Sequence, residues 1–227
     1  MKQHFQALRG IASRFEYINR GKRVYDFSIE PYRGPQGTIV GCIGMALDIT
    51  ERKKTEDRIR HRASHDGLTG LANYREFFDC LEREVRRAGR TGQPFAVLLL
   101  DLDDLKTIND RLGHLTGNRA LKCLAQVMKE HCRATEIAAR FGGDEFTILL
   151  LDADRERAHH VAERIRDCLK VQSEAPNLSV SIGISVYPQD GSTASDLLEA
   201  ADKRLYENKR SRRLGRAPHD RQPSQIT

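Results

Sequence analysis

The pattern of apolar and polar positions along the chain predicts two parts with different secondary structure. Residues 25–29 alternate, 31–37 are rich in Pro and Gly, and 38–47 form a second, mostly apolar run, so residues 1–50 predict short strands joined by a turn. Residues 51–64 are charged and contain neither Gly nor Pro, which predicts a helical linker. Beyond this linker, helix and strand patterns alternate.

The second part begins with apolar positions at helical spacing. Phe77, Leu81 and Val85 are among those that predict a helix over 74–90. The patterns that follow predict a strand at 95–100, helices at 104–112 and 116–132, strands at 136–141 and 145–151, a helix at 155–171, a strand at 178–187 and a helix at 195–211. This mixture predicts an α/β fold of the α+β kind over residues 65–216, and the polar segment 217–227 is expected to be disordered.

Composition narrows the class of protein. The chain has 227 residues, of which 39% are hydrophobic and 31% charged, as in a soluble globular protein. No apolar run approaches the length of a membrane span and no signal peptide opens the chain, so no membrane segment is expected. The five cysteines are scattered and never form a Cys-x-x-Cys pair, which argues against a disulfide framework or a zinc site. The expected compartment is therefore the reducing cytoplasm.

The excess of basic residues suits a phosphate-bearing partner, with a net charge of +6 and a pI near 9.2. Much of it lies in the basic pairs at 203–204, 209–210 and 212–213, which a solvated helix end explains equally well. We do not expect nucleic acid as the partner. As an alternative, nucleic-acid binding predicts strongly salt-dependent association.

Carboxylates gather at two predicted strand ends. The apolar strand ends in Asp101-Leu102-Asp103, and side chains two apart on a strand share one face. The next strand pair is joined through Gly142-Gly143, a strong signal for a tight hairpin, with Asp144-Glu145 directly after it. Glycines let a phosphate approach the backbone, and magnesium prefers carboxylates combined with substrate phosphates. The pattern predicts metal-assisted phosphoryl chemistry, with an ordinary solvated acidic turn as the alternative.

Five segments in chain order resemble the motifs of one enzyme family. Residues 142–146 read GGDEF, which is the signature of diguanylate cyclases. Four other segments also resemble family motifs: 66–73 (DGLTGLAN), 101–114 (DLDDLKTINDRLGH), 179–184 (SVSIGI) and 201–209 (ADKRLYENK). This resemblance covers residues 65–213. Separately, 48–53 (DITERK) resembles the exit of a PAS sensor domain, so residues 1–50 resemble its C-terminal half (the PAC region), which could not enclose a ligand pocket by itself.

The family resemblance implies a fold and a reaction. The fold would be the palm-like fold of nucleotidyl cyclases, with a largely antiparallel central sheet flanked by helices, preceded here by a partial PAS β segment. The reaction would condense two GTP into cyclic di-GMP through two attacks of a 3′-hydroxyl on an α-phosphate, releasing two pyrophosphates. Because each domain of the family holds one nucleotide, a homodimer is expected for turnover. The sequence does not indicate the input signal or an upstream sensory partner.

The resemblance also assigns catalytic and metal-binding roles. Asp101 and Asp144 match the carboxylates that bind Mg²⁺, or alternatively Mn²⁺, together with the backbone carbonyl of Leu102. Asp144 also matches the base that activates the 3′-hydroxyl. Glu145 matches a second acidic position that supports metal or ribose, and Lys106 matches a lysine that offsets charge near the triphosphate.

The implied substrate-binding residues are Asn109, His114, Asn118, Gly142, Gly143, Lys209 and Arg213. Lys209 and Arg213 lie at i and i+4, so they share a helix face and can clamp phosphates. Arg216 is a rival for Arg213, and His114 has a structural role as its alternative. The acidic residues Asp103 and Asp104 are predicted to cap the following helix rather than to bind metal.

Two positions depart from the family pattern. The family has Asp where this chain has Asn118, and Asn offers one acceptor and a donating amide instead of two acceptors for guanine. Such a mispaired contact costs about 1–3 kcal/mol, or roughly 10- to 100-fold in affinity, so a relaxed base preference that admits adenine is a hypothesis. A catalytically weak or silent nucleotide-binding module is the alternative function.

The second departure concerns an inhibitory product site, which in the family reads Arg-x-x-Asp. Here the segment runs from Arg133 to Glu136, so the carboxylate is displaced by one methylene. We expect feedback inhibition to be weakened or absent. An ordinary solvated Arg and Glu at a helix–strand junction is the alternative.

Overall fold

The computed structural model describes residues 2–172 and 176–215, with side chains described at 5–56, 64–172 and 176–212. Contacts divide the chain into two units, Met1–Ala63 and Ser64–Thr227. The predicted disordered segment 217–227, and Arg216 before it, lie outside the described residues.

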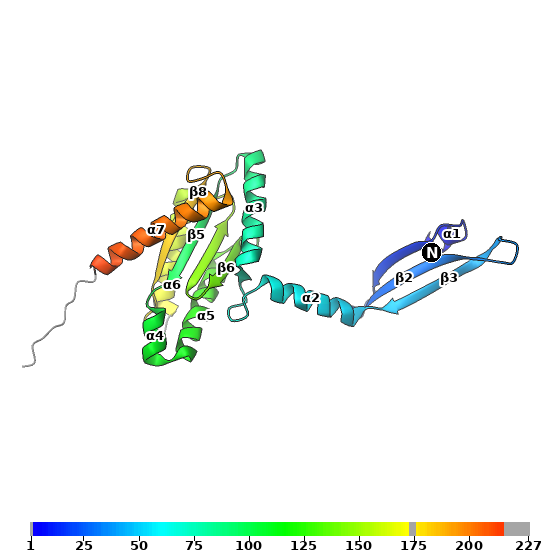
Figure 1. The fold of residues 1–227 in the computed structure, drawn as a ribbon, viewed down its shortest axis with the longest axis horizontal. Coiled ribbons are helices and arrows are strands. Elements are labelled where there is room, and N and C mark those ends of the chain that lie inside the picture. The colour runs from blue at the N-terminus through cyan, green and yellow to red at the C-terminus, as the bar shows by residue number, and fades with distance from the viewer. Residues whose placement is uncertain (1, 173–175, 216–227) are drawn as a thin grey trace, which may run out of the picture. The chain divides into compact units, whose positions relative to one another are not determined.

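The first unit contains a three-stranded antiparallel sheet, a short helix before it and most of a longer helix after it. Its elements are α1 (Lys2–Ala7), β1 (Ser13–Ile18), β2 (Val24–Arg33) and β3 (Ile39–Asp48), and α2 (Thr50–Ser64) follows (Figure 1). The predicted strands and the predicted helix over 51–64 are confirmed, but the predicted start of the turn at Pro31 is wrong. Strand β1 begins at Ser13, opposite Ile29, so at Pro31 β2 has no β1 partner and the missing N–H breaks no bond on that side.

The second unit is a five-stranded sheet in the order β4-β6-β7-β5-β8, antiparallel except for the short β4–β6 pair. Its elements are β4 (Ala72–Asn73), α3 (Tyr74–Thr91), β5 (Phe95–Leu102), α4 (Leu105–Leu112), α5 (His114–His131), β6 (Ile137–Gly142), β7 (Glu145–Leu150), α6 (Arg155–Gln172), β8 (Val180–Tyr187) and α7 (Ala194–Gly215). The predicted fold class, a mixed α/β domain with a largely antiparallel central sheet flanked by helices, is confirmed.

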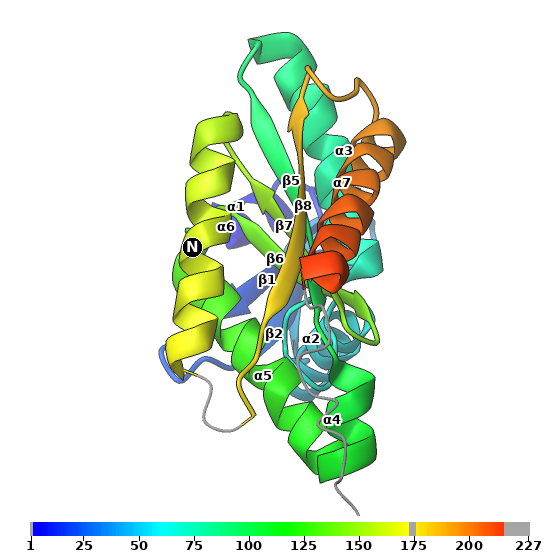
Figure 2. The same cartoon turned by 90° about the vertical axis from the view of Figure 1, so that its left-hand side faces the viewer.

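Helices cover both faces of this sheet. On β5, Leu98 and Leu100 pack with the core beneath α4, α5 and α6, whereas Phe95 and Val97 pack with α3 and α7. Figure 2 shows α6 and α7 on the two sides of β8. Because side chains alternate along a strand, Asp101 faces the same way as Phe95 and Val97, towards α7.

Two boundaries differ from the prediction in a way that affects the carboxylates and the α4–α5 turn. Strand β5 continues to Leu102, so Asp101 lies inside the strand rather than after it. Helix α5 begins at His114, directly after Gly113, whose φ of 83° is a conformation that glycine adopts without strain.

Candidate active site

The site begins with Asp101, where three strands of the second unit come together. Asp101 lies opposite Glu145 of β7 and Ser181 of β8, and it is only 7% exposed. Its Oδ2 lies 2.7 Å from Nζ of Lys209 on α7. Burial raises the pKa of Asp101 above its ordinary value, the nearby Asp144 carboxylate adds to the rise, and Lys209 opposes it. A buried carboxylate in this setting is stabilised by added positive charge.

The hairpin between β6 and β7 holds Asp144 beside this carboxylate. Gly142 has a φ of 146° and Gly143 a φ of 54°, conformations that favour glycine and allow the tight turn. Both carbonyls of the turn are held, because Leu102 N–H donates to Asp144 O at 3.0 Å and Arg140 NH2 donates to Gly143 O at 2.7 Å. The tip is therefore fixed to the end of β5.

Arg140 extends this support to the segment before α3. Its NH1 lies 3.2 Å from both carboxylate oxygens of Asp66, which also accepts hydrogen bonds from the Thr69 backbone and hydroxyl. These contacts hold the pKa of Asp66 below its ordinary value, although burial opposes them. Sequence reasoning did not single out Arg140, because its partner lies 74 residues away in the chain.

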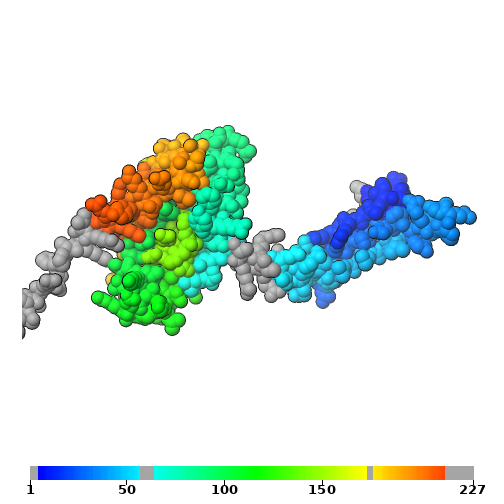
Figure 3. Space-filling model, viewed as in Figure 1, coloured from blue at the N-terminus to red at the C-terminus, as the bar shows by residue number. Residues whose placement is uncertain are grey.

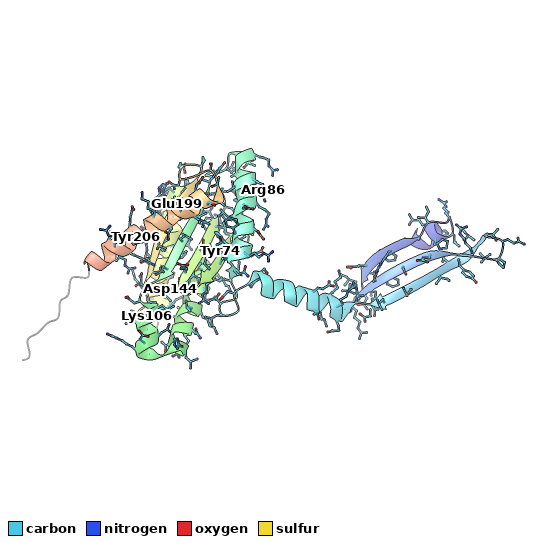
Figure 4. The ribbon with its side chains drawn as sticks, viewed as in Figure 1. Tyr74, Arg86, Lys106, Asp144, Glu199 and Tyr206 are labelled. Carbon is cyan, nitrogen blue, oxygen red and sulfur yellow. The ribbon has the colours of Figure 1, made fainter. Side chains whose placement is uncertain are left out.

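A cavity of about 270 Å³ lies between the hairpin, α4 and α7. Its lining residues are Asp101, Asp103, Asp104, Leu105, Lys106, Thr107, Asp144, Ser181, Lys209 and Arg212. Figure 3 shows the hairpin at the surface between α7 and the α4–α5 segment, and Figure 4 shows Asp144 and Lys106 at the same end of the sheet. The cavity thus brings four carboxylates, two lysines and Arg212 into one opening.

Asp103 links the start of β8 to α7 at the wall of the cavity. The prediction that Asp103 caps α4 is wrong. Its carboxylate accepts hydrogen bonds from Ser179 at 2.8 Å and Ser181 at 2.7 Å, and it pairs with Arg212. Asp104 occupies the N-cap position of α4 with a φ of 59°, and its side chain makes no capping hydrogen bond. The side chain of Arg213 lies outside the described residues, so Arg212 is the arginine placed at the cavity.

Helix α7 reaches the cavity because it packs directly on β8. A Cβ at Gly183 would lie 2.0 Å from the Ala201 carbonyl oxygen and 2.5 Å from the Leu205 nitrogen. Only glycine permits this approach. The close packing sets the height of α7 above the sheet and with it the position of Lys209.

The other predicted nucleotide-binding residues lie on the α4–α5 pair, away from the cavity wall. Asn109 packs where a Cβ of Gly117 would be, 1.9 Å from its Oδ1, so Gly117 makes room for it. His114 and Asn118 are exposed on α5. Glu145 is also exposed, and it does not line the cavity that contains Asp144.

Arg133 and Glu136 line a different cavity, of about 420 Å³, beside His65 and Lys129. The Glu136 side chain is 1% exposed, pairs with Arg157 and accepts a hydrogen bond from the Arg133 backbone at 2.8 Å. The Glu136 carboxylate is therefore occupied by contacts inside the protein, whereas the Arg133 side chain is exposed.

The donor set fits a divalent cation that shares its ligands with a substrate. Among the residues whose side chains are described, no group of three or more His, Cys, Asp or Glu could hold a metal alone. Asp101 and Asp144 line the cavity together, and their mutual repulsion contributes to the raised pKa of Asp101. Two hard carboxylates leave positions for phosphate oxygens, as Mg²⁺ requires. Leu102 does not line the cavity with its side chain, which is buried.

The part of the chain that the structure describes contains no helix long and apolar enough to cross a bilayer.

Comparison with known proteins identifies relatives of the second unit. The family described as "Diguanylate cyclase, GGDEF domain" matches residues 63–214. Diguanylate cyclase DgcM of Escherichia coli (strain K12) is 35% identical over 187 residues, covering 80% of this chain and 45% of DgcM. Several curated relatives, DgcM among them, are longer proteins, and the chain spans less than half the length of each of these.

Solved structures agree with this assignment. The crystal structure of a sensory box/GGDEF family protein from Caulobacter crescentus is 36% identical, with a TM-score of 0.61, covering 65% of this chain and 99% of that one. The coiled coil and GGDEF domain of DgcB from the same organism, in complex with c-di-GMP, is 27% identical with a TM-score of 0.67, covering 72% and 89%.

Proposed function

This chain belongs to the GGDEF family of diguanylate cyclases, and we propose that it condenses two GTP molecules into cyclic di-GMP with release of two pyrophosphates. The observation that carries the proposal is the cavity in which Asp101, Asp144, Lys106 and Lys209 meet beside the Gly142-Gly143 turn. Carboxylates for a metal, cations for a triphosphate and a glycine turn open to phosphate are the parts that phosphoryl transfer requires.

Each of these residues has a step to perform. Asp101 and Asp144, with the Leu102 carbonyl, would hold Mg²⁺ or Mn²⁺, which supplies Lewis-acid activation of the 3′-hydroxyl and neutralises phosphate charge. Asp144 accepts the proton of the attacking 3′-hydroxyl. Lys106 and Lys209 offset the charge that develops on the leaving pyrophosphate. Glu145, exposed at the tip, supports the metal or the ribose.

A homodimer is part of the proposal, because cyclisation joins two nucleotides reciprocally. The cavity of about 270 Å³ suits the phosphates of one nucleotide and cannot hold two complete nucleotides. Two copies facing each other would therefore each present one GTP. The reaction would take place in the cytoplasm, where GTP is available and where the five cysteines remain as the free thiols seen here.

The proposed domain organisation assigns residues 1–50 to the C-terminal half of a PAS domain, 51–64 to a helical linker and 65–216 to the GGDEF domain. The three-stranded sheet of the first unit and the division of contacts after Ala63 support it. The family match over 63–214 supports the assignment of residues 65–216 to the GGDEF domain.

A relaxed base preference is the second candidate, favoured by Asn118. It lies exposed on α5 immediately after Gly117, the residue that accommodates Asn109. Because Asn can pair with adenine as well as guanine, we expect turnover of ATP in mixtures with GTP, and a GTP KM that falls roughly 10- to 100-fold in Asn118→Asp. Rates with GTP, ATP and their mixture measure this. Strict GTP selectivity, equal to that of Asn118→Asp, would refute it.

One assay distinguishes the proposed enzyme from a nucleotide-binding module without catalytic activity. Purified protein is incubated with GTP and Mg²⁺ while pyrophosphate is followed. The proposed cyclase releases pyrophosphate, whereas the silent module binds GTP and releases none.

A further inference from the structure

Another cavity, of about 460 Å³, lies at the start of β8 and wraps around the edge of the sheet. Its lining residues are Arg166 and Lys170 of α6, the segment 179–181, and Asn208, Ser211 and Arg212 of α7. Strand β8 is the last in the sheet order, so its outer side faces this cavity instead of another described strand. Figure 2 shows how α6 and α7 flank the strand from its two sides.

Arg166 is the unusual member of this cavity. It is half-buried, yet it has no hydrogen bond or ion pair with any residue whose side chain is described. Burial lowers the pKa of Arg166 and the neighbouring Arg212 lowers it further, while Glu163, Asp103 and Asp167 offset part of this. A half-buried guanidinium without an acceptor costs free energy, which a bound anion would recover.

The other cations of the cavity are Lys170 and Arg212, and both already make polar contacts. Lys170 pairs with the exposed Asp167 at 3.1 Å, an i,i+3 contact that water screens. Arg212 uses a single nitrogen, NH1, for Asp103 and for the Val180 carbonyl, among the described residues. Since Val180 directs this carbonyl away from β5, its N–H points to the same open edge.

The hydroxyl groups add little donor capacity. Ser179 and Ser181 donate to Asp103, and Ser211 donates to the Glu207 carbonyl at 3.1 Å. Recognition therefore depends on three cations spread over two helices, an arrangement that suits a ligand with several anionic oxygens spaced apart more than a single small anion.

We infer that this cavity binds an oligophosphate anion, and that its occupant is the inorganic pyrophosphate released in the neighbouring cavity. The identity of the occupant rests on the proposed function, whereas the binding itself does not. Arg212 and Ser181 line both cavities, so a pyrophosphate has a short route from one to the other. Removal of pyrophosphate from the catalytic cavity would leave Lys106 and Lys209 available for the triphosphate of the next GTP.

Calorimetric titration of the full chain with inorganic pyrophosphate, in EDTA and without GTP, tests the inference. We expect one pyrophosphate per chain and a loss of affinity of about tenfold or more in Arg166→Gln, because one charge-assisted contact is removed. Lys170→Gln, at an exposed position, should also weaken binding, and Arg166→Lys should retain part of it. The control is Arg164→Gln on the same helix, whose side chain contacts His131 at 3.1 Å.

Lys106→Gln distinguishes the two cavities and is expected to leave this pyrophosphate binding in place. The inference fails if Arg166→Gln and Lys170→Gln bind pyrophosphate like the wild type, or if Lys106→Gln alone abolishes binding. Inorganic phosphate and GTP are titrated in parallel. Phosphate binding as tight as that of pyrophosphate would overturn the oligophosphate assignment, and GTP binding that persists in Arg166→Gln would place GTP in the other cavity. Because no turnover is required, a chain that makes no product can still pass this test.

Discussion

Gly183→Ala tests whether the contact between α7 and β8 sets the catalytic geometry. The added Cβ would lie 2.0 Å from the Ala201 oxygen and 2.5 Å from the Leu205 nitrogen. Both are backbone atoms, so no side-chain rotation relieves the clash. The helix must move away from the sheet by about 1 Å or more, at a cost of about 1–3 kcal/mol in the free energy of unfolding.

The same displacement acts on the cavity. Lys209 and Arg212 are carried on α7, and the 2.7 Å contact between Lys209 Nζ and Asp101 would be lost. We expect kcat for pyrophosphate release to fall about 100-fold, because a misplacement of ~1 Å at a reacting site has an effect of this size. The assay combines urea unfolding with initial rates in GTP and Mg²⁺.

Gly67→Ala is the matched control, because a Cβ at Gly67 meets nothing within 4 Å. It should leave both stability and rate close to those of the wild type. Wild-type stability in Gly183→Ala would refute the packing argument. A destabilised Gly183→Ala with an unchanged kcat would refute the link between α7 and the site.

Three further predictions concern other contacts. Arg140→Ala removes the donors that hold Gly143 and Asp66, so kcat should fall at least about tenfold while the urea midpoint changes less; an unchanged kcat would contradict this. Asp190 accepts hydrogen bonds from Arg155 and Arg204, which hold its pKa well below its ordinary value. The stabilisation from this carboxylate is thus complete above about pH 4 and is lost as the pH falls towards the folded-state pKa. Asp190→Asn should therefore be on the order of 3 kcal/mol less stable than the wild type at pH 7. In urea titrations, this difference in the free energy of unfolding should narrow below about pH 4. Arg133→Ala should leave the response to added cyclic di-GMP unchanged, because Glu136 is committed to Arg157; potent product inhibition that Arg133→Ala abolishes would show the opposite.

Much of the second unit could be predicted from sequence because its core obeys simple periodicities. Strand β5 is apolar on both faces, and the helices carry apolar positions at helical spacing, so their existence and order followed from pattern alone. The meeting of Asp101 and Asp144 was implied by the family resemblance, which assigns both carboxylates to one metal, and the two residues line one cavity.

What could not be predicted depends on contacts distant in sequence. Asp103 has the local features of a helix cap, yet Ser179 and Ser181, 76 and 78 residues away, take its carboxylate. Neither periodicity nor turn chemistry encodes such partners. For the same reason the sequence did not indicate the role of Arg140, whose partner Asp66 is 74 residues away.

Product analysis with GTP and Mg²⁺ shows whether the carboxylate of Asp144 at the hairpin tip drives cyclic dinucleotide synthesis. Wild type is compared with Asp144→Asn and with the control Asp202→Asn, which makes the same substitution at an exposed position of α7. We expect cyclic di-GMP and two pyrophosphates per product from wild type and Asp202→Asn, and a loss of synthesis of at least about 100-fold in Asp144→Asn. Undiminished synthesis by Asp144→Asn, or no cyclic dinucleotide from the wild type, would contradict this expectation.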